Sequence, residues 1–297
     1  MNRLISGLVA AAMVAGVLGG CAPVVTPRPS PTPTVTTDPV PTLTVTPTTS
    51  TPLPPPASQP VALKVYFAYQ EKMQPAARTA PAGTKAVLKA ALDALLAGPT
   101  SSERAGGLVT MVPKGTKLRG VTISANVAIV DFDSTFASGG GSLSMFDRLA
   151  QVVYTATQFP GVDAVTFKLD GKKVTVFGGE GIIIDKPRTR KACEGETPAI
   201  LVDTPAWRGT LKAGDVVRGT ANVFEGTFKI EVRDSAGTLV SSKTVQATSG
   251  TGTRGTWSVA PALTGAKAGI GSIRVYAESP KDGSPVDVVK VPVILEP

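Results

Sequence analysis

A proline- and threonine-rich stretch limits where this chain can fold. Residues 22–60 contain 13 prolines and 11 threonines, and Arg28 and Asp38 are the only charged residues among them. Proline lacks a backbone N–H and fixes φ, and the stretch holds too little apolar surface to build a core. We therefore expect residues 21–60 to be a disordered, extended tether, with the folded part of the chain beginning at residue 61.

The residues before the tether have the anatomy of a secretory signal. They begin with a basic residue, Arg3, continue through an apolar run over residues 4–18 and end in small residues. This run is shorter than a membrane-spanning helix normally requires. The pattern predicts a signal peptide over residues 1–20 that is removed from the mature chain.

The junction between signal and tether resembles the lipobox of bacterial lipoproteins. The residues that carry the resemblance are Leu18, Gly19, Gly20 and Cys21. In that motif the cysteine thiol receives diacylglycerol, and the mature protein carries two or three acyl chains, which is enough for stable anchoring. The resemblance implies lipidation of Cys21 and a lipid anchor on the extracytoplasmic face of the cell membrane.

Composition restricts the chemistry available to the chain. It has 297 residues, enough for two ordinary domains, and no histidine. The absence of histidine excludes the commonest general base, Ser-His and Cys-His pairs and most catalytic zinc sites. We therefore expect a protein that is not an enzyme and has no catalytic residues, cofactor or metal.

The basic charge has one dense cluster. The formal net charge of +8 is spread along the chain, except in the segment KPRTRK, which holds Lys186, Arg188, Arg190 and Lys191. A nucleic-acid binder would concentrate such charge with aromatic residues nearby, so no nucleic acid partner is expected. The net positive charge favours attraction to acidic lipids or wall polymers. A solvated basic linker over residues 186–198 explains the charge cluster equally well.

Residues 61–185 are predicted to form an α+β domain. Alternating apolar residues indicate strands, and apolar residues at helical spacing indicate two helices. Their order, β-α-β-β-α-β-β, predicts two helices covering one face of a mixed sheet. The expected strands are 63–70, 118–124 and 126–133, the helices are 83–99 (capped by Thr84) and 142–159, and a hairpin over 162–177 turns at Asp170-Gly171.

This region resembles the GerMN domain of sporulation and spore-germination proteins. The resemblance lies in the segments VYF, ALLAGP, MVPKGTKL, VAIVDFDSTF and LAQVVYTATQFPGVDAVTFKLDGK, which occur in the family's order. It implies a noncatalytic, ring-building-like α+β module of cell-envelope proteins, which are often lipid-anchored.

Residues 199–297 are predicted to form an immunoglobulin-like β-sandwich. Seven short alternating segments are separated by turns such as 234–237 and 281–283. The region has no cysteine, so it lacks the disulfide of true immunoglobulin domains. We expect Trp257 and Phe224 to anchor its core.

The same region resembles the immunoglobulin-like domain of bacterial spore-germination proteins. The residues that carry this resemblance are VFEGTFKIEVRD, RGTW and AESPKDGSPVDVVKVPV. This domain frequently accompanies GerMN, so the two resemblances support each other.

Three motifs have a functional and a structural interpretation. Asp131 and Asp133 lie on one face of a strand, as a metal or acid–base pair requires, but turn chemistry is favoured. Residues 139–141 precede a helix and could hold an anion, but a flexible lead-in is favoured because the Lys-Ser/Thr of a phosphate loop is missing. The loop 279–285 is interpreted as a hairpin turn rather than a binding loop.

Cys193 is the thiol left over once Cys21 is lipidated. We expect it in an exposed interdomain segment, where it forms an intermolecular disulfide or remains unpaired without a function.

Together these features predict a binding protein. It would present two interaction modules in the cell envelope, for assembly or signalling with other envelope proteins. The alternative is a lipoprotein that binds an anionic wall polymer or carbohydrate through the sandwich and the basic linker.

Overall fold

The computed structural model describes residues 59–297, and Pro55–Pro297 form one compact unit. The predicted signal peptide, the lipobox residues Leu18 to Cys21 and nearly all of the tether lie outside the described residues. Within them, no helix is both long and apolar enough to cross a membrane.

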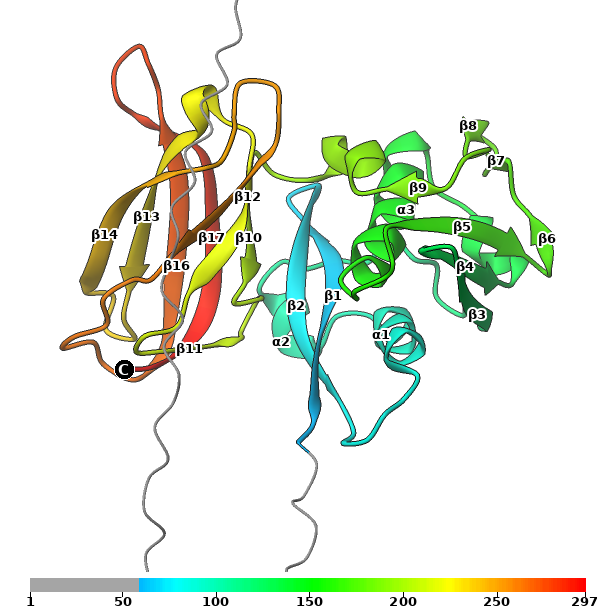
Figure 1. Cartoon of the computed structure of the whole chain (residues 1–297), viewed down its shortest axis with the longest axis horizontal. Helices are drawn as coiled ribbons and strands as arrows, with labels where there is room; N and C mark the ends of the chain where they lie inside the picture. Colours follow the sequence, from blue (N-terminus) through cyan, green and yellow to red (C-terminus); the bar gives the residue numbers. More distant parts are fainter. Residues whose placement is uncertain (1–58) are drawn as a thin grey trace, which may run out of the picture. The chain divides into compact units, whose positions relative to one another are not determined.

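The first region is α+β, as predicted. It begins with an antiparallel hairpin of β1 (Val61–Tyr69) and β2 (Lys72–Ala80), seen in Figure 1. The elements that follow are α1 (Val87–Leu96), α2 (Ser101–Ala105), β3 (Leu118–Ser124), β4 (Val127–Phe132), η1 (Ser134–Ala137), α3 (Ser142–Ala156), β5 (Ala164–Leu169), β6 (Lys172–Lys173), β7 (Val176–Phe177) and β8 (Ile182–Ile183).

The main sheet of this region is mixed. Its strands run in the order β3-β4-β5-β6, and β9 (Arg188–Thr189) also pairs with β5. β4 and β5 are parallel, and α3 provides the long crossover that parallel neighbours require. The hairpin β1–β2 and the pair β7–β8 form separate sheets, so the strands are divided among three sheets rather than joined in the one layer we expected. α3 contacts both the β1–β2 hairpin and β5.

The local signals account for most element boundaries. Asp170 and Gly171 both have positive φ, at 47° and 80°, as a two-residue turn between antiparallel strands requires. The first helix is shorter than predicted, because Thr84 hydrogen-bonds the carbonyl of Pro81 rather than capping α1. α3 also ends before the predicted residue 159.

The second region is a β-sandwich. All seven predicted segments are strands, and a short additional strand pairs in parallel with the last of them. The strands are β10 (Ile200–Thr204), β11 (Thr210–Lys212), β12 (Val217–Ala221), β13 (Thr227–Arg233), β14 (Leu239–Gln246), β15 (Gly255–Val259), β16 (Gly269–Glu278) and β17 (Pro285–Glu296). The two sheets have the orders β10-β12-β15 and β11-β17-β16-β13-β14.

The sandwich core confirms one predicted anchor and contradicts the other. Trp257 is buried and packs edge-on against Phe228, with ring centroids 5.2 Å apart. Phe224 is 63% exposed in the short helical segment η3 (Phe224–Gly226), so its assignment to the core was wrong. The alternation that places Phe228 inward begins only after η3, at Thr227.

The segment joining the two regions is partly packed against the first region rather than wholly solvated. Arg188 and Thr189 form β9, and Lys191–Glu196 form the helical segment η2. Cys193 is fully buried within η2, so the expectation of an exposed thiol was wrong. Its side chain joins the core of the first region because η2 packs on α3.

Candidate binding site beside a buried polar network

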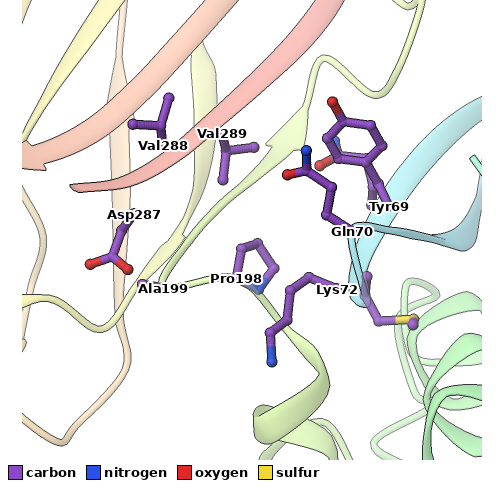
Figure 2. Close-up of a pocket in the computed structure, with 10 residues that line it drawn as sticks. Tyr69, Gln70, Lys72, Pro198, Ala199, Asp287, Val288 and Val289 are labelled. Atoms are coloured by element: carbon purple, nitrogen blue, oxygen red, sulfur yellow. The ribbon is translucent and has the colours of Figure 1, made fainter. Parts of the chain in front are cut away.

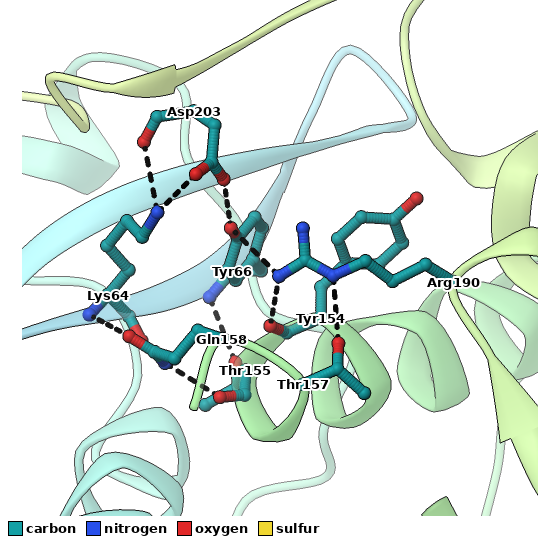
Figure 3. Close-up of polar contacts among 8 residues, drawn as sticks. All are labelled: Lys64, Tyr66, Tyr154, Thr155, Thr157, Gln158, Arg190 and Asp203. Atoms are coloured by element: carbon teal, nitrogen blue, oxygen red, sulfur yellow. Dashed lines mark hydrogen bonds and ion pairs between the residues drawn. The ribbon is translucent and has the colours of Figure 1, made fainter. Parts of the chain in front are cut away.

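A polar network joins β1 to β10. The carboxylate of Asp203, on β10, accepts hydrogen bonds from the Lys64 ammonium and the Tyr66 hydroxyl (Figure 3). Tyr66 is fully buried, and the Lys64 and Asp203 side chains are only 24% and 21% exposed. These residues lie 137 and 139 positions apart in the chain, so the network ties the two regions together.

Arg190 extends the network into the joining segment. Its guanidinium donates to Thr157 Oγ1 at 2.8 Å and to the Tyr154 carbonyl at 3.2 Å. The same group lies over the rings of Tyr154 and Tyr66, as Figure 3 shows. Arg190 is therefore held inside the protein, and the cluster KPRTRK is not a uniform solvated patch.

The network controls the protonation of its members. Burial raises the pKa of Tyr66, and the neighbouring Asp203 carboxylate raises it further. Burial opposes ionisation of Asp203 as well, but the Lys64 ammonium and the Tyr66 hydroxyl bond outweigh burial and hold the pKa of Asp203 below its usual value. The carboxylate is therefore charged at neutral pH and balanced by Lys64 and Arg190.

A hollow of about 470 Å³ lies on the β10–β12–β15 sheet beside this network. Its lining combines cations with hydroxyl and amide groups: Arg190, Leu201, Asp203, Arg218, Gly219, Thr220, Gln246, Thr248, Thr256, Trp257 and Ser258. A second hollow of about 300 Å³ shares Arg190 and Thr220 with the first and adds Lys191 and Arg254. We call these two hollows together the basic groove.

Some cations of the basic groove have partners within the protein and others do not. Arg254 pairs with Glu194 at 3.2 Å, and Arg190 belongs to the buried network. Arg218 and Lys191 are exposed and make no ion pair with any described residue. Free cations beside hydroxyl side chains suit a ligand that carries both anionic and hydroxyl groups.

The predicted carboxylate pair serves turns, as favoured. Asp131 Oδ1 accepts the backbone N–H of Gly171 at 3.0 Å, and Asp133 Oδ1 accepts that of Lys117 at 3.1 Å. The two carboxylates thus hold different loops. Among residues 59–297, no group of three or more Cys, Asp or Glu side chains is placed to hold a metal ion.

The glycine run before α3 is held by an arginine that sequence analysis missed. Arg148 is buried and donates to the carbonyls of Phe136, Ser138 and Gly139, at 2.6, 3.1 and 3.0 Å. These bonds hold the chain up to Gly139, and none of them reaches Gly140 or Gly141, so the expectation of a flexible lead-in stays a prediction for these two residues. The available signal was a lone arginine within the apolar sequence of the second helix.

The loop 279–285 is a hairpin turn between β16 and β17, as expected. The N–H of Ser279 donates to the Ser284 carbonyl at 2.8 Å, and Asp282 Oδ1 accepts the N–H of Ser284 at 3.0 Å. These internal bonds account for the polar residues of the loop.

Sequence analysis also missed a buried carboxylate next to Arg148. Asp147 is fully buried, and neither of its oxygens has a hydrogen-bond partner among the described residues. Burial, reinforced by Glu196, raises its pKa to about 6, while Lys72 acts in the opposite direction. Asp147 is a destabilising group in its charged form.

The fold defines a two-domain protein with an α+β module and an immunoglobulin-like module, and the basic groove lies next to their joint. Residues 64–175 match the Germane family, described as sporulation and spore germination. Residues 199–284 match Gmad2, the immunoglobulin-like domain of bacterial spore germination. The chain thus carries one domain of each family and is related to germination proteins, as the resemblances predicted.

The solved structures that match this chain include two from one sporulation protein. The first GerMN domain of GerM from Bacillus subtilis is 25% identical over 44% of this chain and 98% of that chain, with a TM-score of 0.37. The tandem GerMN domains of GerM are 18% identical, covering 63% of this chain and 60% of that one, with a TM-score of 0.38.

A third similar structure is a putative lipoprotein from Clostridium perfringens. It is 22% identical over 46% of this chain and 93% of that chain, with a TM-score of 0.34. No curated protein matches the chain.

Proposed function

We propose that this chain is a noncatalytic, lipid-anchored protein of the cell envelope that presents its two domains to other envelope proteins as one binding unit. The observation that carries the proposal is the ion pair between Lys64 and Asp203, with Tyr66 as its third member, which joins the two domains.

A joint of this kind supports a fixed binding surface rather than two independent modules. Breaking this partly buried ion pair leaves a poorly compensated charge, so the domains prefer one relative orientation. Trp207 adds to the joint, because its backbone N–H donates to the Pro75 carbonyl at 2.7 Å and its ring centroid lies 5.1 Å from that of Tyr69. A partner can then contact both domains without first ordering them.

The anchor is supported by the lipobox resemblance at Cys21 and by the composition of residues 22–60. A tether of 39 residues at about 3 Å per residue would let the binding unit work up to roughly 120 Å from the membrane. Such a reach suits a partner embedded in the wall or in the opposite membrane.

The anchor and the partner are tested separately. Metabolic labelling of the full chain with an alkyne fatty acid should mark the protein and fail with Cys21→Ala. Cross-linking in cells should then capture the same one or two envelope proteins repeatedly, and the Cys21→Ala form should lose them. A labelled anchor without any recurrent partner would contradict the interaction role while leaving the anchor intact.

A second candidate function is binding of an anionic wall polymer, and the basic groove favours it. Arg218 and Lys191 are free cations there, flanked by Thr220, Thr256 and Ser258. Cations of this kind bind polyanions in a salt-dependent way. Purified anionic wall polymer should bind the full chain, and raising salt from 50 to 500 mM should weaken binding at least tenfold.

Arg218→Gln provides the specific test of that candidate. It should weaken polymer binding several-fold, whereas Lys281→Gln, in the exposed turn between β16 and β17, should have little effect. Equal losses in both variants would indicate attraction to net charge alone, which contradicts a site in the groove.

A further inference from the structure

A separate hollow of about 190 Å³ lies between the tip of the β1–β2 hairpin and β17 (Figure 2). Pro198, Val288 and Val289 give it apolar walls, and Gln74, Lys72 and Asp287 give it polar groups. We call it the hairpin pocket. It shares no lining residue with the basic groove, so it is a distinct place in the molecule.

The residue that most favours a polar ligand here is Gln74. Its side chain is only 2% exposed and lines the pocket, and its Nε2 has no hydrogen-bond acceptor among the described residues. A buried donor without an acceptor costs about 1–3 kcal/mol, and buried polar atoms are otherwise nearly always paired. The nitrogen itself is covered by its neighbours, so a rotation of the Gln74 amide towards the pocket is needed before an occupant's oxygen can accept from it and remove that cost.

Lys72 indicates that the oxygen is charged. Residues two apart on a strand share a face, so Lys72 and Gln74 project from the same side of β2. The Lys72 ammonium donates to the Gly195 carbonyl at 2.7 Å, which leaves two of its three donors available. A carboxylate can accept from both side chains, and the adjacent apolar walls fit an aliphatic group.

The other side of the pocket offers an unpaired strand edge. β11 pairs with β17 only at Ile294–Glu296. The Pro292 carbonyl accepts the Arg208 N–H and the Ile294 N–H donates to Gly209, so both face away from β16. Backbone groups two residues apart on a strand point in the same direction, so the N–H and carbonyl of Lys290 also face away from β16. Neither group has a hydrogen-bond partner among the described residues.

An unpaired edge of this kind accepts an extended peptide, and the peptide's side chains enter the adjoining pocket. The open edge ends at Asp287, whose φ of 54° interrupts the strand where the pocket begins. Asp287 lies on the wall formed by β17, across the pocket from Lys72, as Figure 2 shows. Its carboxylate would repel a second anion and favour a basic residue in the peptide.

We propose that the hairpin pocket binds the C-terminal end of an extended partner peptide whose last residue is aliphatic. The terminal carboxylate accepts from Gln74 Nε2 and Lys72, the last side chain packs on Val288 and Val289, and the preceding backbone pairs with the edge of β17. A basic residue just before the end meets Asp287. This inference goes beyond the proposed function and does not rest on the lipid anchor or the basic groove.

A labelled peptide tests the chemistry directly. Fluorescence anisotropy would measure binding of the full chain to the hexapeptide STVTKL with a free C-terminus and to the same peptide with a C-terminal amide. We expect the amide to bind at least tenfold more weakly, because it loses the charge on which Lys72 acts. Equal binding of the two peptides, or none by either at 1 mM, would overturn the proposal.

Strand pairing is tested by changing the peptide rather than the protein. N-methylation of alternate residues removes the backbone donors that would pair with β17, and it should weaken binding at least tenfold when it falls on the paired set. N-methylation of the other set, which faces away, is the matched control. Binding of N-acetyl-leucine as tight as that of the hexapeptide would overturn the strand-pairing part.

Two protein variants complete the test. Gln74→Met keeps the side-chain length and removes the unpaired donor, so it should weaken binding at least fivefold while leaving the unfolding temperature unchanged or higher. Lys72→Gln should also weaken binding at least fivefold, whereas Lys85→Gln, on the exposed loop before α1, should not. Unchanged affinity in Gln74→Met would overturn the assignment of this residue.

Discussion

The guanidinium carbon of Arg190 lies 4.6 Å from the centroid of the Tyr154 ring, so a residue from a basic sequence cluster is stacked on α3. Lysine cannot reproduce this arrangement, because it lacks the planar group that stacks on the ring while donating to Thr157 and the Tyr154 carbonyl. Arg190→Lys should lower the free energy of unfolding by about 1–3 kcal/mol, measured by urea denaturation. Lys191→Arg, at the exposed neighbouring position, is the control and should change it by less than about 0.5 kcal/mol.

The Asp203 carboxylate should make stability depend on acid pH. Its pKa is lowered in the folded protein, so its contribution is fully present above the unfolded value near 3.9 and is lost as pH falls through the folded pKa. Asp203→Asn should reduce the free energy of unfolding by about 1–3 kcal/mol at pH 7 and by less at pH 3. Asp93→Asn, which breaks the exposed pair with Lys89, should show little loss at either pH. A difference between Asp203→Asn and the unmodified chain that stays constant from pH 7 to 3 would contradict this role.

The Asp147 carboxylate should make the folded protein less stable as pH rises, the opposite of the effect of Asp203. Its folded pKa of about 6 lies above the unfolded value near 3.9, so the folded state holds a proton more tightly and stability falls as pH rises between these values. Asp147→Asn removes the buried charge and should raise the free energy of unfolding by about 1–3 kcal/mol at pH 7.5. At pH 3.5 the variant and the unmodified chain should be nearly equal. Destabilisation at pH 7.5 would show that the carboxylate has a partner that only its charged form can bind.

The packing of the Trp207 ring should require glycine at position 106. A Cβ added at Gly106 would lie 2.9 Å from the Trp207 ring, although its backbone conformation suits alanine. Gly106→Ala should therefore destabilise the chain by about 1–3 kcal/mol, and it should shift Trp207 emission, measured in a Trp257→Phe background. Gly120→Ala, where a Cβ meets no atom within 4 Å, should leave both properties unchanged.

Cys193 should be unreactive until the chain unfolds. It is fully buried, and burial raises its pKa to about 11, so the thiolate fraction at pH 8 is about 100-fold below that of a free cysteine. A chain carrying Cys21→Ser should label with a thiol reagent at least 100 times more slowly when folded than in 6 M guanidinium. Rapid labelling of the folded chain, or a disulfide-linked dimer, would contradict this placement.

Alternating sequence was the reliable signal for strands. All seven sandwich segments were predicted, and the Asp170-Gly171 turn was placed correctly. β2 was missed because its sequence, KMQPAARTA, lacks alternation and contains Pro75. Pro75 is tolerated because β2 pairs fully only with β1 and makes just an isolated bridge at Ala76 on its other side.

The functional features were harder to predict because they depend on distant contacts. The sequence around Arg190 and Cys193 is polar and contains proline, so it indicated an exposed linker. Its burial follows from packing against α3, Tyr66 and Asp203, which local patterns do not encode. Gln74 and Asp147 were missed for the same reason, since an unpaired buried group is visible only when all its neighbours are known.

The joint between Lys64 and Asp203 also has a consequence for how the chain folds. These residues are 139 positions apart, and synthesis from the N-terminus produces β1 long before β10. Contacts of such high contact order form late and slow the folding reaction. The backbone groups of Pro75 and Ala77 on β2 therefore gain their partner, Trp207, only after the start of the sandwich has been synthesised. Until then this edge of the first hairpin can pair wrongly with other chains.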